Sequence, residues 1–269
     1  MTVYFIGAGP GAADLLTVRA VELLKRCPVC LYAGSIVPPE VLEYCPPTAQ
    51  LVNTARRPLA EIIDLIAAAD ARGDDVARLH SGDISVYSAV NEQIRHLLER
   101  GIDYSIVPGV PAFAAAAAAL EQELTVPTVA QSLILTRVEG RASAMPPGET
   151  LANLAASGTT LALHLAAAYT DRIVAELLPL YGPDCACAVV AYASRPEEQV
   201  LRCRLRDLPQ AVADAGIRMT AVIFVGPGVD IAQAHLQGAP TSYLYSDDRP
   251  RDAYGHTICS LADRQRESQ

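Results

Sequence analysis

The chain has 269 residues, of which 51% are hydrophobic, and a formal net charge of −9. A protein that holds a nucleic acid by its phosphates needs a basic stripe, and arginines here occur singly or in pairs, so nucleic acid is excluded as a partner. The longest uncharged apolar run, residues 112–120, is too short to span a bilayer, and the amino terminus enters a strand directly instead of a signal-like basic and apolar region. Seven scattered cysteines suit a reducing compartment better than a disulfide framework. We therefore expect a soluble, cytoplasmic protein.

Short apolar runs alternate with helical periodicity in the first half of the chain. Strands are predicted at residues 3–6, 29–32, 50–52, 76–79 and 105–107. Between them, apolar residues recur at helical spacing, as at Leu59, Ile62, Ile63 and Ile66. This alternation is typical of an α/β protein.

A second set of elements follows a break rich in charge and proline at residues 121–127. Its strands are predicted at residues 133–135, 160–163, 186–190, 200–203 and 221–225. We therefore expect two α/β domains, residues 1–122 and 123–230, followed by a polar and partly disordered tail, residues 231–269. The segment 141–149 is expected to be a loop or lid.

The first strand runs into the glycine-rich loop Gly7-Ala8-Gly9-Pro10-Gly11, and we expect the next helix to begin near Asp14. Glycine lets the backbone approach a ligand or a neighbouring loop closely. The loop loosely matches a dinucleotide-binding pattern, but that site needs an acidic residue about twenty positions on. The first carboxylate after the second strand is Glu40, and Pro10 removes a backbone donor. A nucleotide-linked oxidoreductase is therefore the weaker alternative.

Two further strands run into glycine-containing loops, at residues 80–87 and 108–113. In an open parallel sheet such loops gather at the carboxyl ends of the strands, where ligands bind. The three loops together predict a ligand site. A binding module without catalytic activity remains the last alternative.

Six segments, taken in order, resemble the tetrapyrrole methyltransferases that use S-adenosylmethionine. They are VYFIGAGPGAADLLT at residues 3–17, YAGSIVP at 32–38, SGDISVY at 81–87, PGVPAFAA at 108–115, TRVEGR at 136–141 and YASRPEE at 192–198. Within this family the chain is most similar to the group that methylates precorrin-4 at C-11, giving precorrin-5 in cobalamin synthesis. The resemblance implies a two-domain fold with the active site in the cleft between the domains, and a homodimer. Methylation of another ring carbon, or of cobalt-precorrin-4, remains open.

The resemblance also implies which residues hold S-adenosylmethionine. They are Pro10, Ser81, Gly82, Asp83, Val86, Ala112, Phe113, Leu165, Tyr192, Ala193, Thr220 and Ala221. The carboxylate of Asp83 is suited to accept hydrogen bonds from the amino group or the adenosine hydroxyls of the cofactor. The alternative role for Asp83 is to cap the helix that follows Tyr87.

The tetrapyrrole acceptor carries many carboxylates, and arginine is the side chain that holds a carboxylate with two donors. The candidate substrate-binding residues are Arg56, Arg57, Tyr87, Arg137, Arg141 and Arg195. No catalytic residue is assigned, because transfer of a methyl group to an electron-rich carbon depends mainly on positioning. No metal site is predicted, and the five histidines, His80, His96, His164, His235 and His256, are expected to be structural.

Overall fold

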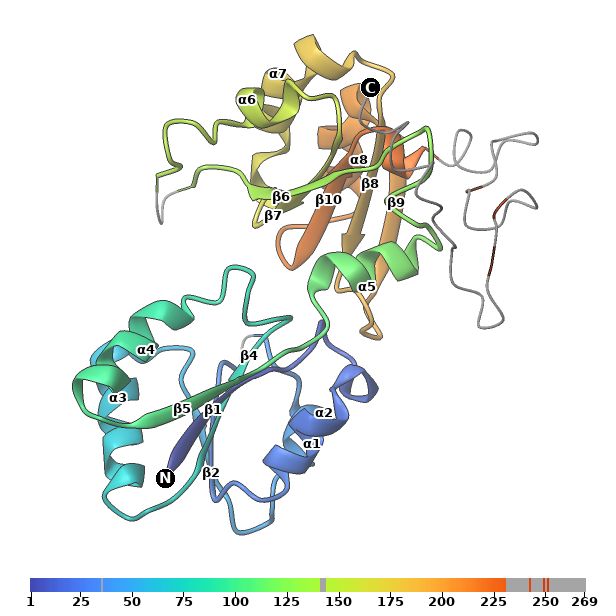
Figure 1. Ribbon diagram of the computed structural model, residues 1–269. Coiled ribbons are helices and arrows are strands. Elements are labelled where there is room, and N and C mark those ends of the chain that lie inside the picture. The colour runs from blue at the N-terminus through green and yellow to red at the C-terminus, as the bar shows by residue number, and fades with distance from the viewer. Residues whose placement is uncertain (35, 141–143, 231–241, 243–248, 250, 252–269) are drawn as a thin grey trace.

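The computed structural model describes residues 1–34, 36–140, 144–230, 242, 249 and 251. These residues form two five-stranded sheets, each flanked by helices (Figure 1), which confirms the expected two-domain α/β fold. Most of the tail lies outside the described residues. Within the described part of the chain, no helix has the length and apolar character needed to cross a membrane.

The first sheet is parallel throughout, with strand order β3-β2-β4-β1-β5. Its strands are β1 (Thr2–Gly7), β2 (Val29–Tyr32), β3 (Gln50–Asn53), β4 (Val76–His80) and β5 (Asp103–Val107). Its helices are α1 (Val18–Leu24), α2 (Pro39–Leu42), α3 (Leu59–Asp70) and α4 (Val90–Glu99). Buried side chains of α1 and α2 form one core with the sheet, and those of α3 and α4 form another. Because all five strands run the same way, the three glycine-containing loops leave from one edge.

The start of the first helix differs from the prediction. Residues Ala13–Leu15 form one 3-10 turn, and α1 begins at Val18, four residues beyond Asp14. The Thr17 hydroxyl accepts a 3.2 Å hydrogen bond from the Ala20 amide and so caps the helix. The capping threonine, rather than the acidic residue before it, sets the boundary.

The second sheet is mixed, with strand order β6-β7-β10-β8-β9. Its strands are β6 (Leu133–Arg137), β7 (Thr160–His164), β8 (Ala186–Ala191), β9 (Gln199–Arg204) and β10 (Ala221–Val225). Strand β10 is antiparallel to β7 and β8, whereas β6 is parallel to β7. One face is covered by α6 (Leu151–Ala155), α7 (Thr170–Tyr181) and α8 (Leu208–Asp214). Each strand predicted from the sequence is present.

Helix α5 (Ala112–Ala119) follows the last strand of the first sheet but packs on the second. Figure 1 shows α5 lying against the strands of the second sheet. The buried Ala115 and Ala116 share a core with Ala188 of β8 and Phe224 of β10. The helix is apolar all round, as the sequence indicates, and it covers the face opposite α6, α7 and α8.

Cys27 and Cys30 are both fully buried in the core beside α1. Burial raises the pKa of the Cys27 thiol to about 12, so this thiol stays protonated at neutral pH. All six cysteines among the described residues are free thiols.

Candidate active site

The three glycine-containing loops of the first sheet meet through their backbones. Gly9 and Gly82 exchange two backbone hydrogen bonds, of 3.2 Å and 2.7 Å. A Cβ atom on Gly7 would lie 2.6 Å from the amide nitrogen of Gly109, and one on Gly109 would lie 2.3 Å from the carbonyl oxygen of Gly82. These glycines are therefore required by contact between loops, which builds one rigid surface at the edge of the sheet.

Asp83 ties the second of these loops to the third. Its carboxylate accepts hydrogen bonds from the Ser85 amide at 2.9 Å and from the Gly109 amide at 2.8 Å. Burial raises the pKa of Asp83, but the hydrogen bonds from Ser85 and Gly109 outweigh burial, so the net pKa lies below its ordinary value. Helix α4 begins at Val90 and takes no side-chain cap, so the alternative role of Asp83 as a helix cap is wrong.

Three candidate residues of the second sheet share an unusual backbone conformation. Leu165, Tyr192 and Thr220 have φ values of 52°, 53° and 52°. Leu165 follows β7, Tyr192 follows β8 and Thr220 precedes β10. Because β10 is antiparallel to β7 and β8, all three lie at the same edge of the sheet. There the Tyr192 amide donates a 2.8 Å hydrogen bond to the Thr220 carbonyl. Left-handed backbone costs free energy for non-glycine residues and clusters at functional sites. Nothing in the sequence signals it, because none of the three is glycine or asparagine.

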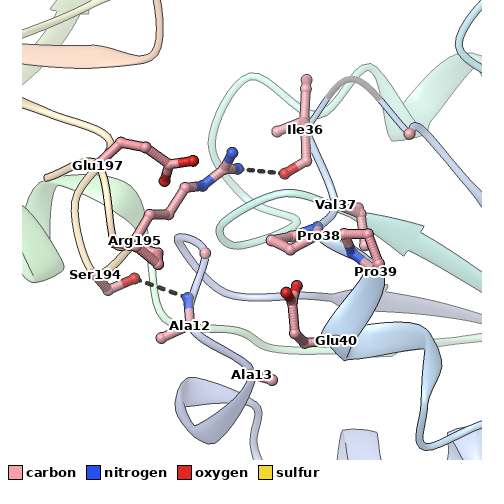
Figure 2. Close-up of a pocket in the computed structure, with 13 residues that line it drawn as sticks. Ala12, Ala13, Ile36, Val37, Pro38, Pro39, Glu40, Ser194, Arg195 and Glu197 are labelled. Carbon is pink, nitrogen blue, oxygen red and sulfur yellow. Dashed lines mark hydrogen bonds between the residues drawn. The ribbon is translucent and has the colours of Figure 1, made fainter.

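The edges of the two sheets face each other and are joined by polar contacts. The amide of Ala12 donates to the hydroxyl of Ser194 at 3.0 Å, and the guanidinium of Arg195 donates to the carbonyl oxygen of Ile36. Figure 2 shows both contacts, with Arg195 reaching from the segment after β8 toward the loop after β2. The junction between the sheets is therefore built from the loops that the sequence analysis singled out.

A cavity of about 660 Å³ opens at this junction. Its walls come from both sheets: Gly11, Ala12, Ala13, Gly34, Ile36, Val37, Pro38, Pro39, Glu40, Ser194, Arg195, Pro196 and Glu197. The carboxylate of Glu40 points into the space below Arg195 (Figure 2). A ligand of several hundred cubic ångströms fits a space of this size.

A second part of the junction is aromatic. The ring of His164, at the end of β7, lies 5.5 Å from that of Tyr87 and 6.5 Å from that of Phe113. Burial raises the pKa of Tyr87, and the positive charge of nearby Arg137 opposes the rise. Tyr87, Phe113 and Arg137 therefore lie near one another, although they come from three different elements.

The candidate residues lie in several parts of the structure. Pro10, Ser81, Gly82, Asp83 and Val86 belong to the converging loops, and Ala112 and Phe113 open α5 directly after the third loop. Ala193 stands beside Tyr192 after β8, and Ala221 is the first residue of β10. Arg56 and Arg57 are exposed in the loop after β3, where Arg57 pairs with Glu61 at 2.9 Å. Arg141 lies outside the described residues. Sequence reasoning missed Ser194 as a junction residue, although it stands inside a segment that carried the resemblance.

Comparisons with known proteins agree with this architecture. Residues 2–209 match the family model of the Tetrapyrrole (Corrin/Porphyrin) Methylases. The chain is 61% identical over 230 residues to a precorrin-4 C(11)-methyltransferase of a Sinorhizobium species, covering 86% of this chain and 91% of that protein.

Two solved structures are also similar. A cobalt-precorrin-4 methyltransferase superposes with a TM-score of 0.83 and 39% identity, covering 85% of this chain and 96% of the other. The uroporphyrin-III C-methyltransferase of Thermus thermophilus, solved with S-adenosylhomocysteine, has a TM-score of 0.72 and 28% identity, covering 85% and 99%. The chain belongs to the tetrapyrrole (corrin/porphyrin) methylases.

Proposed function

We propose that this protein transfers a methyl group from S-adenosylmethionine to C-11 of precorrin-4, giving precorrin-5 in cobalamin synthesis. The observation that carries the proposal is the 61% identity to a precorrin-4 C(11)-methyltransferase over 91% of its length. The S-adenosylhomocysteine complex of the Thermus relative supports the identity of the methyl donor.

The residues at the junction fit an S-adenosylmethionine site. Asp83, whose pKa is lowered, is ionised at neutral pH and therefore accepts hydrogen bonds from an ammonium group or from hydroxyls. The left-handed backbone at Leu165, Tyr192 and Thr220 turns the chain at the ends of three strands. We assign cofactor binding to these residues together with Pro10, Ser81, Gly82, Val86, Ala112, Phe113, Ala193 and Ala221.

The main work of the protein in this reaction is positioning. When bound, S-adenosylmethionine would supply an electrophilic methyl group to the electron-rich ring carbon: the new carbon–carbon bond forms as the methyl–sulfur bond breaks, and S-adenosylhomocysteine leaves in line. The rigid contact of Gly7, Gly82 and Gly109 holds the first surface, and the Ala12–Ser194 bond fixes the second sheet against it. Holding two reactants in this way accounts for several kcal/mol of a barrier, about 7–11 in favourable cases.

Arginines are assigned to the carboxylates of the acceptor. Arg195 lines the large cavity, and Arg137 lies beside Tyr87. Arg56 and Arg57 lie after β3, at the carboxyl edge of the first sheet, and Arg141 follows β6 in the sequence. Planar guanidinium groups spread over several loops suit an acceptor whose carboxylates lie around its ring.

Cobalt-precorrin-4 is the second candidate acceptor, because the solved structure with a TM-score of 0.83 is a cobalt-precorrin-4 methyltransferase. We propose the metal-free substrate because the relative at 61% identity is named for it. The purified protein should be incubated with S-adenosylmethionine and either metal-free or cobalt-bearing precorrin-4, and the products analysed by mass spectrometry and NMR. Faster methylation of the metal-free ring at C-11 is expected.

Two outcomes would reject the proposal. No methylation of either ring would remove the activity, and a methyl group on another carbon would change the assignment. Calorimetry with S-adenosylmethionine and with NAD distinguishes a methyltransferase from a nucleotide-linked oxidoreductase. Binding of NAD without binding of S-adenosylmethionine would favour the oxidoreductase. We also propose that the protein is a cytoplasmic homodimer. Light scattering after gel filtration measures the mass of the assembly and so tests whether it is a dimer.

A further inference from the structure

His164 ends β7 on the face of the second sheet that α5 covers. Ala162, two residues earlier on the same face, packs in the core with α5, whereas Leu161 and Leu163 point into the opposite core. His164 is only 9% exposed. It directly precedes Leu165, the first of the three left-handed residues at the sheet edge. The side chain is thus buried beside the junction between the sheets.

The Nε2 atom of His164 is buried and has no hydrogen-bond partner among the residues that the structure describes. A buried polar atom without a partner costs about 1–3 kcal/mol, so such a group calls for an explanation, and a partner supplied by a bound molecule is one. Burial also lowers the pKa of His164, so the ring is neutral at pH 7 and Nε2 can either donate or accept a hydrogen bond.

The aromatic rings beside His164 present a surface that a cation can contact. The rings of Tyr87 and Phe113, at 5.5 Å and 6.5 Å, present aromatic surface, and aromatic faces attract positive charge. The neutral imidazole adds no repulsion. Among the described residues, two titratable groups lie nearby. Arg137 is the residue opposite His164 in the pairing of β6 with β7, and the negative charge of Glu149 raises the pKa of Tyr87. Helix α5 and strand β10 contribute no titratable side chain to this site.

We propose that the Nε2 atom of His164 hydrogen-bonds to bound S-adenosylmethionine, making His164 a cofactor-binding residue between Tyr87 and Phe113. The inference rests on the proposed function, because it takes the methyl donor as the ligand. The pattern of the sequence alone assigned His164 a structural role. The unpartnered atom and the two flanking rings are the reasons for proposing a binding role instead.

The test compares His164→Phe with His164→Gln. Phenylalanine keeps a buried ring but removes Nε2, whereas glutamine keeps a polar amide near the same place. We expect the dissociation constant for S-adenosylmethionine, measured by calorimetry, to rise about tenfold in His164→Phe, the loss of one hydrogen bond, and to recover in part in His164→Gln. Comparing S-adenosylmethionine with its neutral product locates the contact: weakening of both places it on their shared part, and weakening of the sulfonium alone places it at the methyl centre.

His80→Phe is the matched control. Within the described part of the chain, His80 also has a buried Nε2 without a partner, but its ring lies 6.0 Å from Phe5, whose side chain packs in the core beside α3 and α4. We expect His80→Phe to keep the parent's affinity for the cofactor. The free energy of unfolding of each variant, measured in urea, accounts for structural effects.

Three results would overturn the inference. They are unchanged cofactor affinity in His164→Phe, equal weakening in the His80 and His164 variants, and a rise in the Michaelis constant for the tetrapyrrole with cofactor affinity intact. The proposed function fails separately, because in that case the parent protein itself would not bind S-adenosylmethionine.

Discussion

The amide of Ala12 and the hydroxyl of Ser194 form a 3.0 Å hydrogen bond across 182 residues of sequence. It joins the first glycine-rich loop to the segment after β8. The same segment contributes Arg195, which contacts Ile36 in the loop after β2. Two adjacent residues of the segment after β8, Ser194 and Arg195, therefore fix the spacing between the walls of the 660 Å³ cavity.

Ser194→Ala should lower the free energy of unfolding by about 1 kcal/mol, because the partly buried Ala12 amide loses its partner. Urea unfolding followed by circular dichroism measures the change. Ser157→Ala is the control, since the exposed Ser157 hydroxyl bonds to the nearby carbonyl of Leu154. Equal effects of the two substitutions would show that the bond between the sheets adds nothing.

Gly109→Ala should destabilise the protein by more than about 2 kcal/mol, in the range of substitutions that force backbone to move. The added Cβ would lie 2.3 Å from the Gly82 carbonyl oxygen and 2.7 Å from the Gly7 backbone. A Cβ on Gly148 would meet none of the described residues within 4 Å, so Gly148→Ala serves as the control. Thermal unfolding of both variants checks the expectation, and a Gly109→Ala protein as stable as the control would contradict the loop contact.

Asp83→Asn should remove stability in a pH-dependent way. The folded pKa of Asp83 is lowered, so its contribution is present above the ordinary value near 3.8 and is lost as the pH falls through the folded value. An amide keeps only one acceptor oxygen and turns a donor toward either Ser85 or Gly109. Urea unfolding at several pH values should show a difference from the parent at pH 7 that shrinks in acid. A difference that stays constant with pH would argue against the ionised form as its source.

The same Asp83→Asn variant should bind S-adenosylmethionine less tightly than the parent, since the proposed site uses the carboxylate charge. Calorimetry at pH 7 measures this. Full affinity combined with lost stability would leave Asp83 as a residue that only joins the two loops.

Thr220→Gly should raise stability by about 1 kcal/mol and weaken cofactor binding. The φ of 52° is strained for a β-branched residue, and glycine removes the strain at the proposed site. Thr128, with φ of 63° and also exposed, lies outside the candidate residues, so Thr128→Gly should raise stability without changing affinity. If both variants keep full affinity, the conformation of Thr220 has no part in binding.

Arg195→Ala should raise the Michaelis constant for the tetrapyrrole while the affinity for S-adenosylmethionine stays nearly unchanged. Arg195→Lys should recover only part of the loss, because a point charge cannot make a two-pronged contact. Arg72→Ala, which removes an exposed arginine paired with Asp74, is the control. If Arg195→Ala instead lost affinity for S-adenosylmethionine and kept the Michaelis constant for the tetrapyrrole, Arg195 would belong to the cofactor site and not to the acceptor site.

The local part of the fold could be predicted from the sequence, because each strand is a short apolar run and its pattern is independent of distant residues. The start of α1 was predicted too early because Thr17, rather than Asp14, provides the cap. For the site, the segments that carried the resemblance located the loops. The partner of Asp83, Gly109, stands 26 residues away, and the left-handed backbone of Leu165 has no local signal. Such features arise only when the sheets are assembled.

Helix α5 is attached to the end of the first sheet's last strand while its side chains fill the face of the second. A fragment that begins after this helix would leave Ala162, Ala188, Val190 and Phe224 uncovered, which favours aggregation. A fragment that stops before it would retain the complete first sheet with its own helices. Attempts to express the halves separately should therefore succeed only when the carboxyl-terminal piece starts ahead of residue 112, with the helix as its amino-terminal cover.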